Sequence, residues 1–476
     1  MPNRLLSFLI LLALVAGCSK PKPTPMLAEI YNPELQKPRV EERPVVVLPG
    51  ILGTRLRQNE TDRVVWGAFT GGYANPGRPD GAALVALPMA PGVPLNELTD
   101  DVRPDGALDT LELRILNLPV KLSAYVDILR TLGVAGYADQ SLLQYSDEHF
   151  TCFQFDYDWR RDNAENAAKL YRRLVEIQAY THEQLVAKHG VDNVPPREEI
   201  KIDLVAHSMG GLVARYMLRY GDAELPADGS MPELTWKGAK LVDRLIMVGT
   251  PNAGSVDAFR QLVEGKDFSS GSVAFWLPFA PPAVLGSMPS IYQLLPRPRH
   301  EAIVLPNGEA IDLYDADFWI SRRLGLAGND QLDELGWILD DDVPNDQRRD
   351  VAEDHLRKVL ARAEQFHDAI DVPATRPAGL NIHLFAGDAV DTDEQLVLRN
   401  DNTIDTLRMA AGDGTVLRSS ALMDERLNPD LPGRASASLT SPIDWSGVFF
   451  LFQDHLGITR SPEFTDNVLF LLLEAP

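Results

Sequence analysis

The sequence predicts an α/β protein with a mostly parallel central sheet, because short β-branched runs alternate with longer segments of helical periodicity. Each predicted strand ends in a loop that carries glycine or polar side chains. In open α/β sheets, ligands bind beyond the carboxyl ends of the strands, so we expect the functional residues in these loops. The predicted strands occupy residues 44–48, 153–155, 200–205, 245–248 and 381–385.

Helical periodicity predicts helices over residues 163–189, 211–220 and 465–474. Residues 66–149 and 256–372 fit the alternation poorly, and we expect them to be cap or lid insertions over the site. The second insertion contains an apolar run at residues 275–279, which is either a lid segment that meets lipid or buried cap core. The folded domain would span residues 43–476.

The first residues predict a bacterial lipoprotein. Arg4 precedes an apolar run that is too short to cross a bilayer, so residues 1–17 are expected to be a signal peptide. Residues 15–18, VAGC, match a lipobox, which predicts cleavage before Cys18 and lipidation of its thiol; the alternative is an ordinary secretory signal. Residues 18–42 are proline-rich and predict a semi-rigid tether. Ser19 after the cysteine favours an outer-membrane location in the cell envelope, facing either the periplasm or the surface.

Composition excludes several functions. The formal charge of −23 and the pI near 4.8 would repel nucleic acid, so contact with the membrane must come from the lipid anchor. Apart from Cys18 the chain has one cysteine, Cys152, which excludes an internal disulfide and a multi-cysteine zinc site. We expect Cys152 in the core, and no metal or cofactor is implied.

The sequence AHSMG at residues 206–210 lies where a predicted strand turns into a predicted helix. This is the context of a nucleophile elbow in the α/β-hydrolase fold, in which small residues flank the serine because the turn crowds the backbone. The five-residue pattern alone is weak evidence in a chain of this length. Its place between strand and helix predicts that Ser208 is a nucleophile.

A serine hydroxyl needs an imidazole to take its proton and a carboxylate to orient that imidazole. In this fold both follow the serine, in the order acid and then histidine. Asp413, in the turn at residues 412–416, and His455, before the last helix, are the predicted acid and base. Asp413 could instead form a simple Asx turn, with Asp388 as the acid, and His455 could be a structural histidine.

A developing oxyanion needs two backbone donors, one after the nucleophile and one after an early strand. The N–H groups of Met209 and Ile51 occupy those positions, although residues 49–53 could also be a tight turn without a catalytic role. His207 is expected to point into the neighbouring loops and is not assigned as the base.

At these residues the chain resembles the lecithin:cholesterol acyltransferase family. The resemblance implies the α/β-hydrolase fold, a triad of Ser208, Asp413 and His455, and oxyanion donors at Ile51 and Met209. The chain lacks the cysteine pair that closes the lid loop of animal members, and its first insertion shows no match to the family. The motifs occur in the family's order at residues 44–54, 157–160, 206–211, 249–251, 287–290, 294–296 and 412–416.

The motif YDWR at residues 157–160 either lines an acyl pocket or closes a buried charged pair, and we favour the second interpretation. The whole pattern predicts a serine-dependent lipid ester hydrolase or O-acyltransferase that acts through an acyl-enzyme on Ser208. Two alternatives remain: a small-ester hydrolase on the same fold, and a non-catalytic envelope lipoprotein. The expected partners are a lipid or ester substrate and the membrane.

Overall fold

The computed structural model describes residues 43–67, 74–107, 111–115, 118–122, 125–141, 149–267, 279–340, 342–428 and 437–475. The predicted signal peptide, Cys18 and the tether therefore lie outside the described residues, as do residues 275–278 of the apolar run. Among the helices that are described, none is both long enough and apolar enough to cross a membrane.

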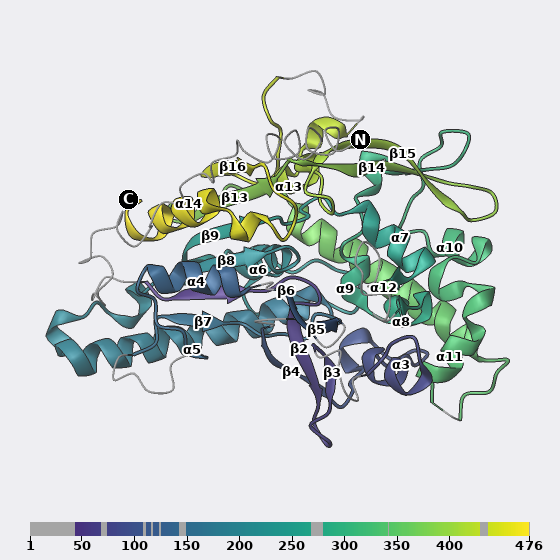
Figure 1. Cartoon of the computed structure of the whole chain (residues 1–476), viewed down its shortest axis with the longest axis horizontal. Helices are drawn as coiled ribbons and strands as arrows, with labels where there is room; N and C mark the ends of the chain where they lie inside the picture. Colours follow the sequence, from purple (N-terminus) through teal and green to yellow (C-terminus); the bar gives the residue numbers. More distant parts are fainter. Residues whose placement is uncertain are drawn as a thin grey trace, which may run out of the picture.

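The centre of the molecule is a six-stranded parallel sheet with the strand order β16-β13-β9-β8-β1-β7 (Figure 1). Strand β8 lies in the middle of the sheet and all six of its residues are buried. This arrangement confirms the predicted fold class. The strands are β1 (Val45–Leu48), β7 (Cys152–Gln154), β8 (Ile202–His207), β9 (Val242–Val248), β13 (Asn381–Gly387) and β16 (Gly447–Leu451).

Helices cover both faces of this sheet. On one face α4 (Val126–Val134) and α14 (Pro462–Leu473) lie side by side, and they bury Val45, Val47 and Val205 (Figure 1). On the other face α5 (Asn163–His189) and α6 (Gly210–Tyr220) bury the alternate residues of the same strands. Cys152 is buried in the hydrophobic core between the sheet and helices α4 and α14, as predicted. Burial raises the pKa of its thiol.

Further elements follow strand β1 and precede β7. A three-stranded antiparallel sheet has the order β3-β2-β4, and a separate hairpin is formed by β5 and β6. These elements are β2 (Thr54–Gln58), β3 (Val64–Trp66), α3 (Pro79–Val85), β4 (Val102–Ala107), β5 (Leu111–Ile115) and β6 (Leu118–Leu122).

A second group of elements lies between β9 and β16, at the right of Figure 1. It contains the long antiparallel hairpin β14–β15, which pairs with β12, and several helices. The elements are α7 (Val256–Glu264), β10 (Lys266–Asp267), β11 (Phe279–Ala280), α8 (Pro282–Gly286), α9 (Pro289–Tyr292), β12 (Ile303–Val304), α10 (Ala316–Arg322), α11 (Leu332–Ile338), α12 (Arg348–Asp371), β14 (Val390–Leu398), β15 (Ile404–Gly412) and α13 (Arg418–Leu422).

The extent of the cap at residues 66–149 and 256–372 stays a prediction. Within these ranges, α4 packs on the central sheet, and α12 packs against α6 through Phe366 and Tyr216.

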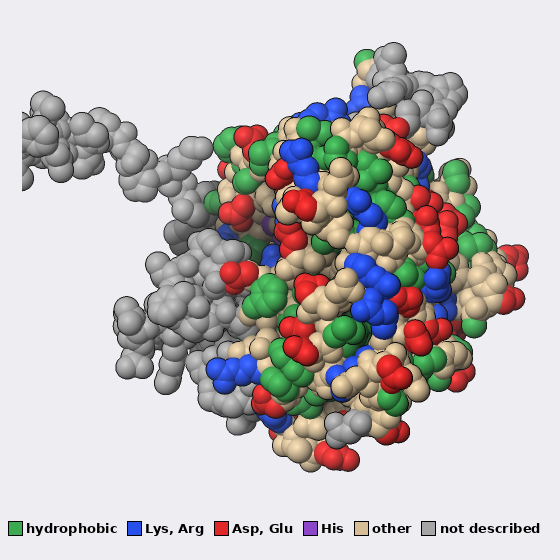
Figure 2. Space-filling view, turned by 90° about the vertical axis from the view of Figure 1, so that its right-hand side faces the viewer, with side chains coloured by type: hydrophobic (Ala, Val, Ile, Leu, Met, Phe, Trp, Pro, Cys, Tyr) green, Lys and Arg blue, Asp and Glu red, His purple; other side chains and the backbone are tan. Residues whose placement is uncertain are grey.

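At the surface, acidic, basic and apolar side chains are interspersed over the face in Figure 2, and basic residues pair with acidic ones, as Arg357 does with Asp317.

The YDWR motif forms a buried ionic contact. The Arg160 guanidinium donates to both carboxylate oxygens of Asp158, at 2.9 and 2.7 Å, and its Nη2 also lies 2.7 Å from Asp100. Burial alone would raise the pKa of Asp158, but the guanidinium outweighs burial and the pKa is lowered. Trp159 donates to the Thr54 carbonyl. The structure therefore agrees with the structural interpretation of this motif.

We predict that Arg160→Met lowers the free energy of unfolding by about 3–5 kcal/mol, because it leaves the buried Asp158 and the half-buried Asp100 without this cation. The matched control is Arg399→Met, which breaks the exposed pair with Asp405 and should cost less than about 1 kcal/mol. Urea unfolding followed by circular dichroism compares the two variants. Equal losses would contradict a structural role for the buried pair.

Candidate active site

Ser208 lies at a sharp turn between β8 and α6. Its φ is +52°, a left-handed conformation that costs a non-glycine residue roughly 1–2 kcal/mol. A Cβ added to Gly50 would lie 2.7 Å from the Ser208 Cβ, and one added to Gly210 would lie 2.6 Å from the Pro49 carbonyl oxygen. The turn therefore requires glycine at both positions, which is the crowding expected of a nucleophile elbow.

The structure brings together the three side chains that the sequence singled out. His455 Nε2 lies 3.1 Å from Ser208 Oγ, and His455 Nδ1 lies 2.8 Å from Asp413 Oδ2. The carboxylate can only accept, so Nδ1 carries the proton, and Nε2 is left to accept from the serine hydroxyl. In this arrangement a proton can pass from the hydroxyl to an imidazole that a carboxylate orients.

Asp413 also forms the Asx turn that was the alternative to an acid role. Its Oδ1 accepts from the N–H groups of Thr415 and Val416, at 2.9 and 2.7 Å, while Oδ2 faces the imidazole. The two interpretations are therefore compatible. Asp388, the other candidate acid, pairs with Arg418 at 3.3 Å and is not hydrogen-bonded to His455.

The imidazole of His455 rests on Gly249, which follows strand β9. Gly249 has a φ of +58°, and an added Cβ would lie 3.1 Å from His455 Nδ1 and 3.4 Å from Asp413 Oδ2. The His455 backbone N–H donates to the Asp413 carbonyl at 2.9 Å. Backbone and side chain together therefore fix the acid relative to the base.

The loop after β1 lies against Ser208. Gly50 donates its N–H to the Tyr125 hydroxyl and Gly53 donates to the Gly50 carbonyl, so two of the loop's N–H groups are occupied. Within the described residues, neither the Ile51 N–H nor the Met209 N–H has a hydrogen-bond acceptor. The two N–H groups are therefore free to bind an oxygen. That they bind the oxyanion of the reaction stays a prediction.

His207 contacts the neighbouring loops, as expected, and is not hydrogen-bonded to the serine hydroxyl. Its Nδ1 lies 3.4 Å from the Tyr125 hydroxyl and its Nε2 lies 3.2 Å from the His455 carbonyl oxygen. Burial, followed by the nearby His455, lowers the pKa of His207 to about 3. Sequence analysis missed Tyr125, which lies 75 residues from its partner Gly50 and belongs to no recognised motif.

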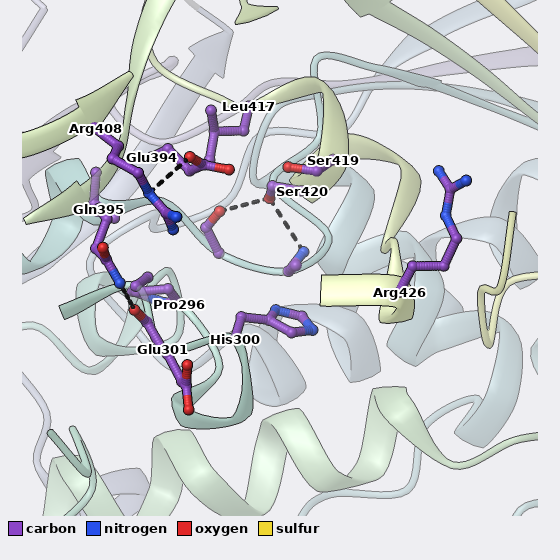
Figure 3. Close-up of a pocket in the computed structure, with 14 residues that line it drawn as sticks. Pro296, His300, Glu301, Glu394, Gln395, Arg408, Leu417, Ser419, Ser420 and Arg426 are labelled. Carbon is purple, nitrogen blue, oxygen red and sulfur yellow. Dashed lines mark hydrogen bonds and ion pairs between the residues drawn. The ribbon is translucent and has the colours of Figure 1, made fainter. Parts of the chain in front are cut away.

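A cavity of about 180 Å³ with both polar and apolar lining lies beyond the acid loop, and its wall includes neither Ser208, Asp413 nor His455 (Figure 3). In its lining, Arg408 pairs with Glu394 and Arg426 with Asp424, and His300 Nε2 lies 3.3 Å from Glu425. In the part of the chain that is described, no group of three or more His, Cys, Asp or Glu side chains is arranged to hold a metal ion.

Comparisons with known proteins give a family and a fold. The family model of lecithin:cholesterol acyltransferase matches residues 101–413. A search of curated proteins finds no match. Among solved structures, the Tle4–Tli4 complex contains a chain with 13% identity and a TM-score of 0.50, and the alignment covers 92% of this chain and 99% of that one.

Two lipases also match across most of the chain. Lipase 1 from Pelosinus fermentans is 12% identical with a TM-score of 0.35, covering 92% of this chain and 100% of that chain. Staphylococcus hyicus lipase is 15% identical with a TM-score of 0.34, covering 93% and 97%.

We predict that Gly249→Ala slows the reaction of Ser208 with a fluorophosphonate probe by about tenfold to a hundredfold, because the added Cβ displaces the imidazole. Gly379→Ala is the matched control: Gly379 also has a positive φ, but its added Cβ meets nothing within 4 Å. The labelling rate at equal concentrations of folded protein checks this. If both variants react equally slowly, backbone strain rather than the position of His455 is responsible.

Proposed function

The chain belongs to the lecithin:cholesterol acyltransferase family, and from this membership we propose that it is a serine-dependent lipid ester hydrolase or O-acyltransferase. The observation that carries the proposal is the hydrogen-bonded series from Ser208 Oγ through His455 to Asp413. Hydroxyl, imidazole and carboxylate in this order are the groups needed for acyl transfer through a covalent intermediate.

In the first step, Ser208 Oγ attacks the ester carbonyl carbon while His455 Nε2 takes the hydroxyl proton. Asp413 stabilises the imidazolium that forms, and the N–H groups of Ile51 and Met209 bind the oxyanion. When the tetrahedral intermediate collapses, the C–O bond to the leaving alcohol breaks and His455 returns the proton to that alcohol. The acyl group is now an ester of Ser208.

In the second step, water or a lipid alcohol attacks the acyl-enzyme, with His455 again as the base. About 15% of the His455 side chain is exposed, which supports access of water and favours hydrolysis. Transfer would require a bound alcohol that displaces this water. The family name supports a lipid ester as the acyl donor. A lipid ester hydrolase should prefer esters with long acyl chains, whereas a small-ester hydrolase should prefer short ones.

We further propose that the mature protein is anchored in the cell envelope through lipidated Cys18, with the outer membrane as its location. Two acyl chains suffice for stable anchoring. Residues 18–42 would span roughly 80 Å as a polyproline-type linker, at about 3.1 Å per residue. A tether of that reach allows the folded domain to approach a bilayer in several orientations.

We predict that Ser208→Ala abolishes both fluorophosphonate labelling and hydrolysis of long-chain p-nitrophenyl esters, because the nucleophile is removed. Ser290→Ala is the control, since Ser290 is buried and its hydroxyl has no hydrogen-bond partner in the described structure. Labelled protein is measured by in-gel fluorescence, and released p-nitrophenol by absorbance. A wild-type protein that neither labels nor hydrolyses any ester would overturn the proposal.

A separate prediction concerns the anchor. In cells fed an alkyne fatty acid, wild-type protein should incorporate the label, and Cys18→Ser should not, because the thiol that receives the lipid is absent. Cys152→Ala removes the other cysteine and should still incorporate it. Loss of incorporation in both variants, or in neither, would contradict lipidation at Cys18.

A further inference from the structure

The peptide group between Pro49 and Gly50 is held at both ends by buried tyrosine hydroxyls. Tyr157 donates to the Pro49 carbonyl oxygen at 2.7 Å, and the Gly50 N–H donates to the Tyr125 hydroxyl at 2.8 Å. The two tyrosines come from opposite sides of the loop, one after β7 and one before α4. Since a peptide group is planar, these two bonds fix the orientation of this one. The next peptide group, which carries the Ile51 N–H, is held by its own carbonyl: the Gly50 carbonyl accepts from the Gly53 N–H at 3.1 Å.

The contacts continue from Tyr125 to the other side of the site. The Tyr125 hydroxyl lies 3.4 Å from His207 Nδ1, and His207 Nε2 lies 3.2 Å from the carbonyl oxygen of His455. Both distances are long for hydrogen bonds, so each contact by itself is weak. Together they form a continuous series from the oxyanion loop to the backbone of the proposed base.

Only one arrangement of protons satisfies this series. The His455 carbonyl can only accept, so His207 carries its proton on Nε2, and its Nδ1 must accept from the Tyr125 hydroxyl. The Tyr125 oxygen then accepts from the Gly50 N–H. All the donors point in the same direction along the series, which is the condition for its bonds to reinforce one another.

His207 is suited to this position because it stays neutral. Its ring centroid lies 4.9 Å from that of His455, where a second imidazolium would oppose the charge that forms during acyl transfer. Burial and His455 both lower the pKa of His207, so it becomes charged only in acid near pH 3. The proton arrangement therefore persists at pH values well above 3.

We propose that Tyr125 and His207 are positioning residues that couple the oxyanion loop to His455, so that the Ile51 N–H and the imidazole keep their places relative to Ser208 Oγ. This proposal rests on the proposed function, since it concerns the same site. Neither side chain is hydrogen-bonded to Ser208 Oγ or to a ring nitrogen of His455. Tyr157 is a third positioning residue, because its hydroxyl holds the Pro49 carbonyl of the same loop.

The test compares Tyr125→Phe and His207→Phe with Tyr220→Phe. Tyr220 is a buried tyrosine whose hydroxyl donates to the Ala369 carbonyl at 2.9 Å, so the control removes a similar buried hydroxyl away from the site. We expect both test variants to react with a fluorophosphonate probe about tenfold to a hundredfold more slowly than wild type, and the control within about twofold of it. With p-nitrophenyl butyrate, kcat should fall while KM stays unchanged.

The double variant Tyr125→Phe/His207→Phe should be no more than about twofold slower than the slower single variant, because both changes break one series. Labelling by either single variant at the Tyr220→Phe rate, or additive losses in the double variant, would overturn the coupling. If Tyr125→Phe does not fold, Tyr157→Phe and His207→Phe decide the same question, and each should be slow. A wild-type chain that never labels would instead refute the proposed function.

Discussion

The left-handed turn at Ser208 is the constraint on which the rest of the site depends. This conformation costs roughly 1–2 kcal/mol and persists because β8, immediately before it, is fully buried and paired on both sides. The turn also limits the residue types of its neighbours, because Gly50 and Gly210 leave no room for a Cβ beside it. Glycine recurs for the same reason under the imidazole, at Gly249, and beside the acid, at Gly387.

Much of this site could be predicted from the sequence because each of its side chains follows a strand or opens a turn with a local signal. The strand and helix around Ser208 have regular periodicity. His455 precedes a helix that its very apolar sequence predicts. Strand β16 was missed because it is a half-buried edge strand without β-branched alternation. The hairpin β14–β15 was missed because its first strand is rich in acidic residues, which are rare in strands.

The choice between the two candidate acids shows why local patterns were insufficient. Asp388 and Asp413 each follow a glycine, and Asp388 comes directly after a sheet strand, where an acid is expected. In the folded chain, the hairpin β14–β15 returns to the sheet edge and delivers Asp413 there, where its carbonyl accepts the His455 N–H. Arg418 binds Asp388 instead. The sequence favoured Asp413 through its turn and the family motif, but left Asp388 open, because the pairing of β14 with β15 has no local signal.

Tyr125 is a stronger case of the same limit, since its bond to Gly50 joins residues 75 positions apart. Contacts of this kind show that different parts of the molecule hold the different groups of the site. The contacts that fix the base and the oxyanion loop run through loops at the ends of β1, β8 and β16 and through the start of α4, all of which are anchored on the central sheet. The elements between β9 and β13 contribute α12, which packs beside α6, and helices that lie farther out. The acid depends on elements of this region: Ser255 at the start of α7 donates to the Thr415 carbonyl at 2.7 Å, Arg260 pairs with Asp393, and β12 pairs with β14. A change in α7 or β12 is therefore transmitted to Asp413 through the hairpin that carries it.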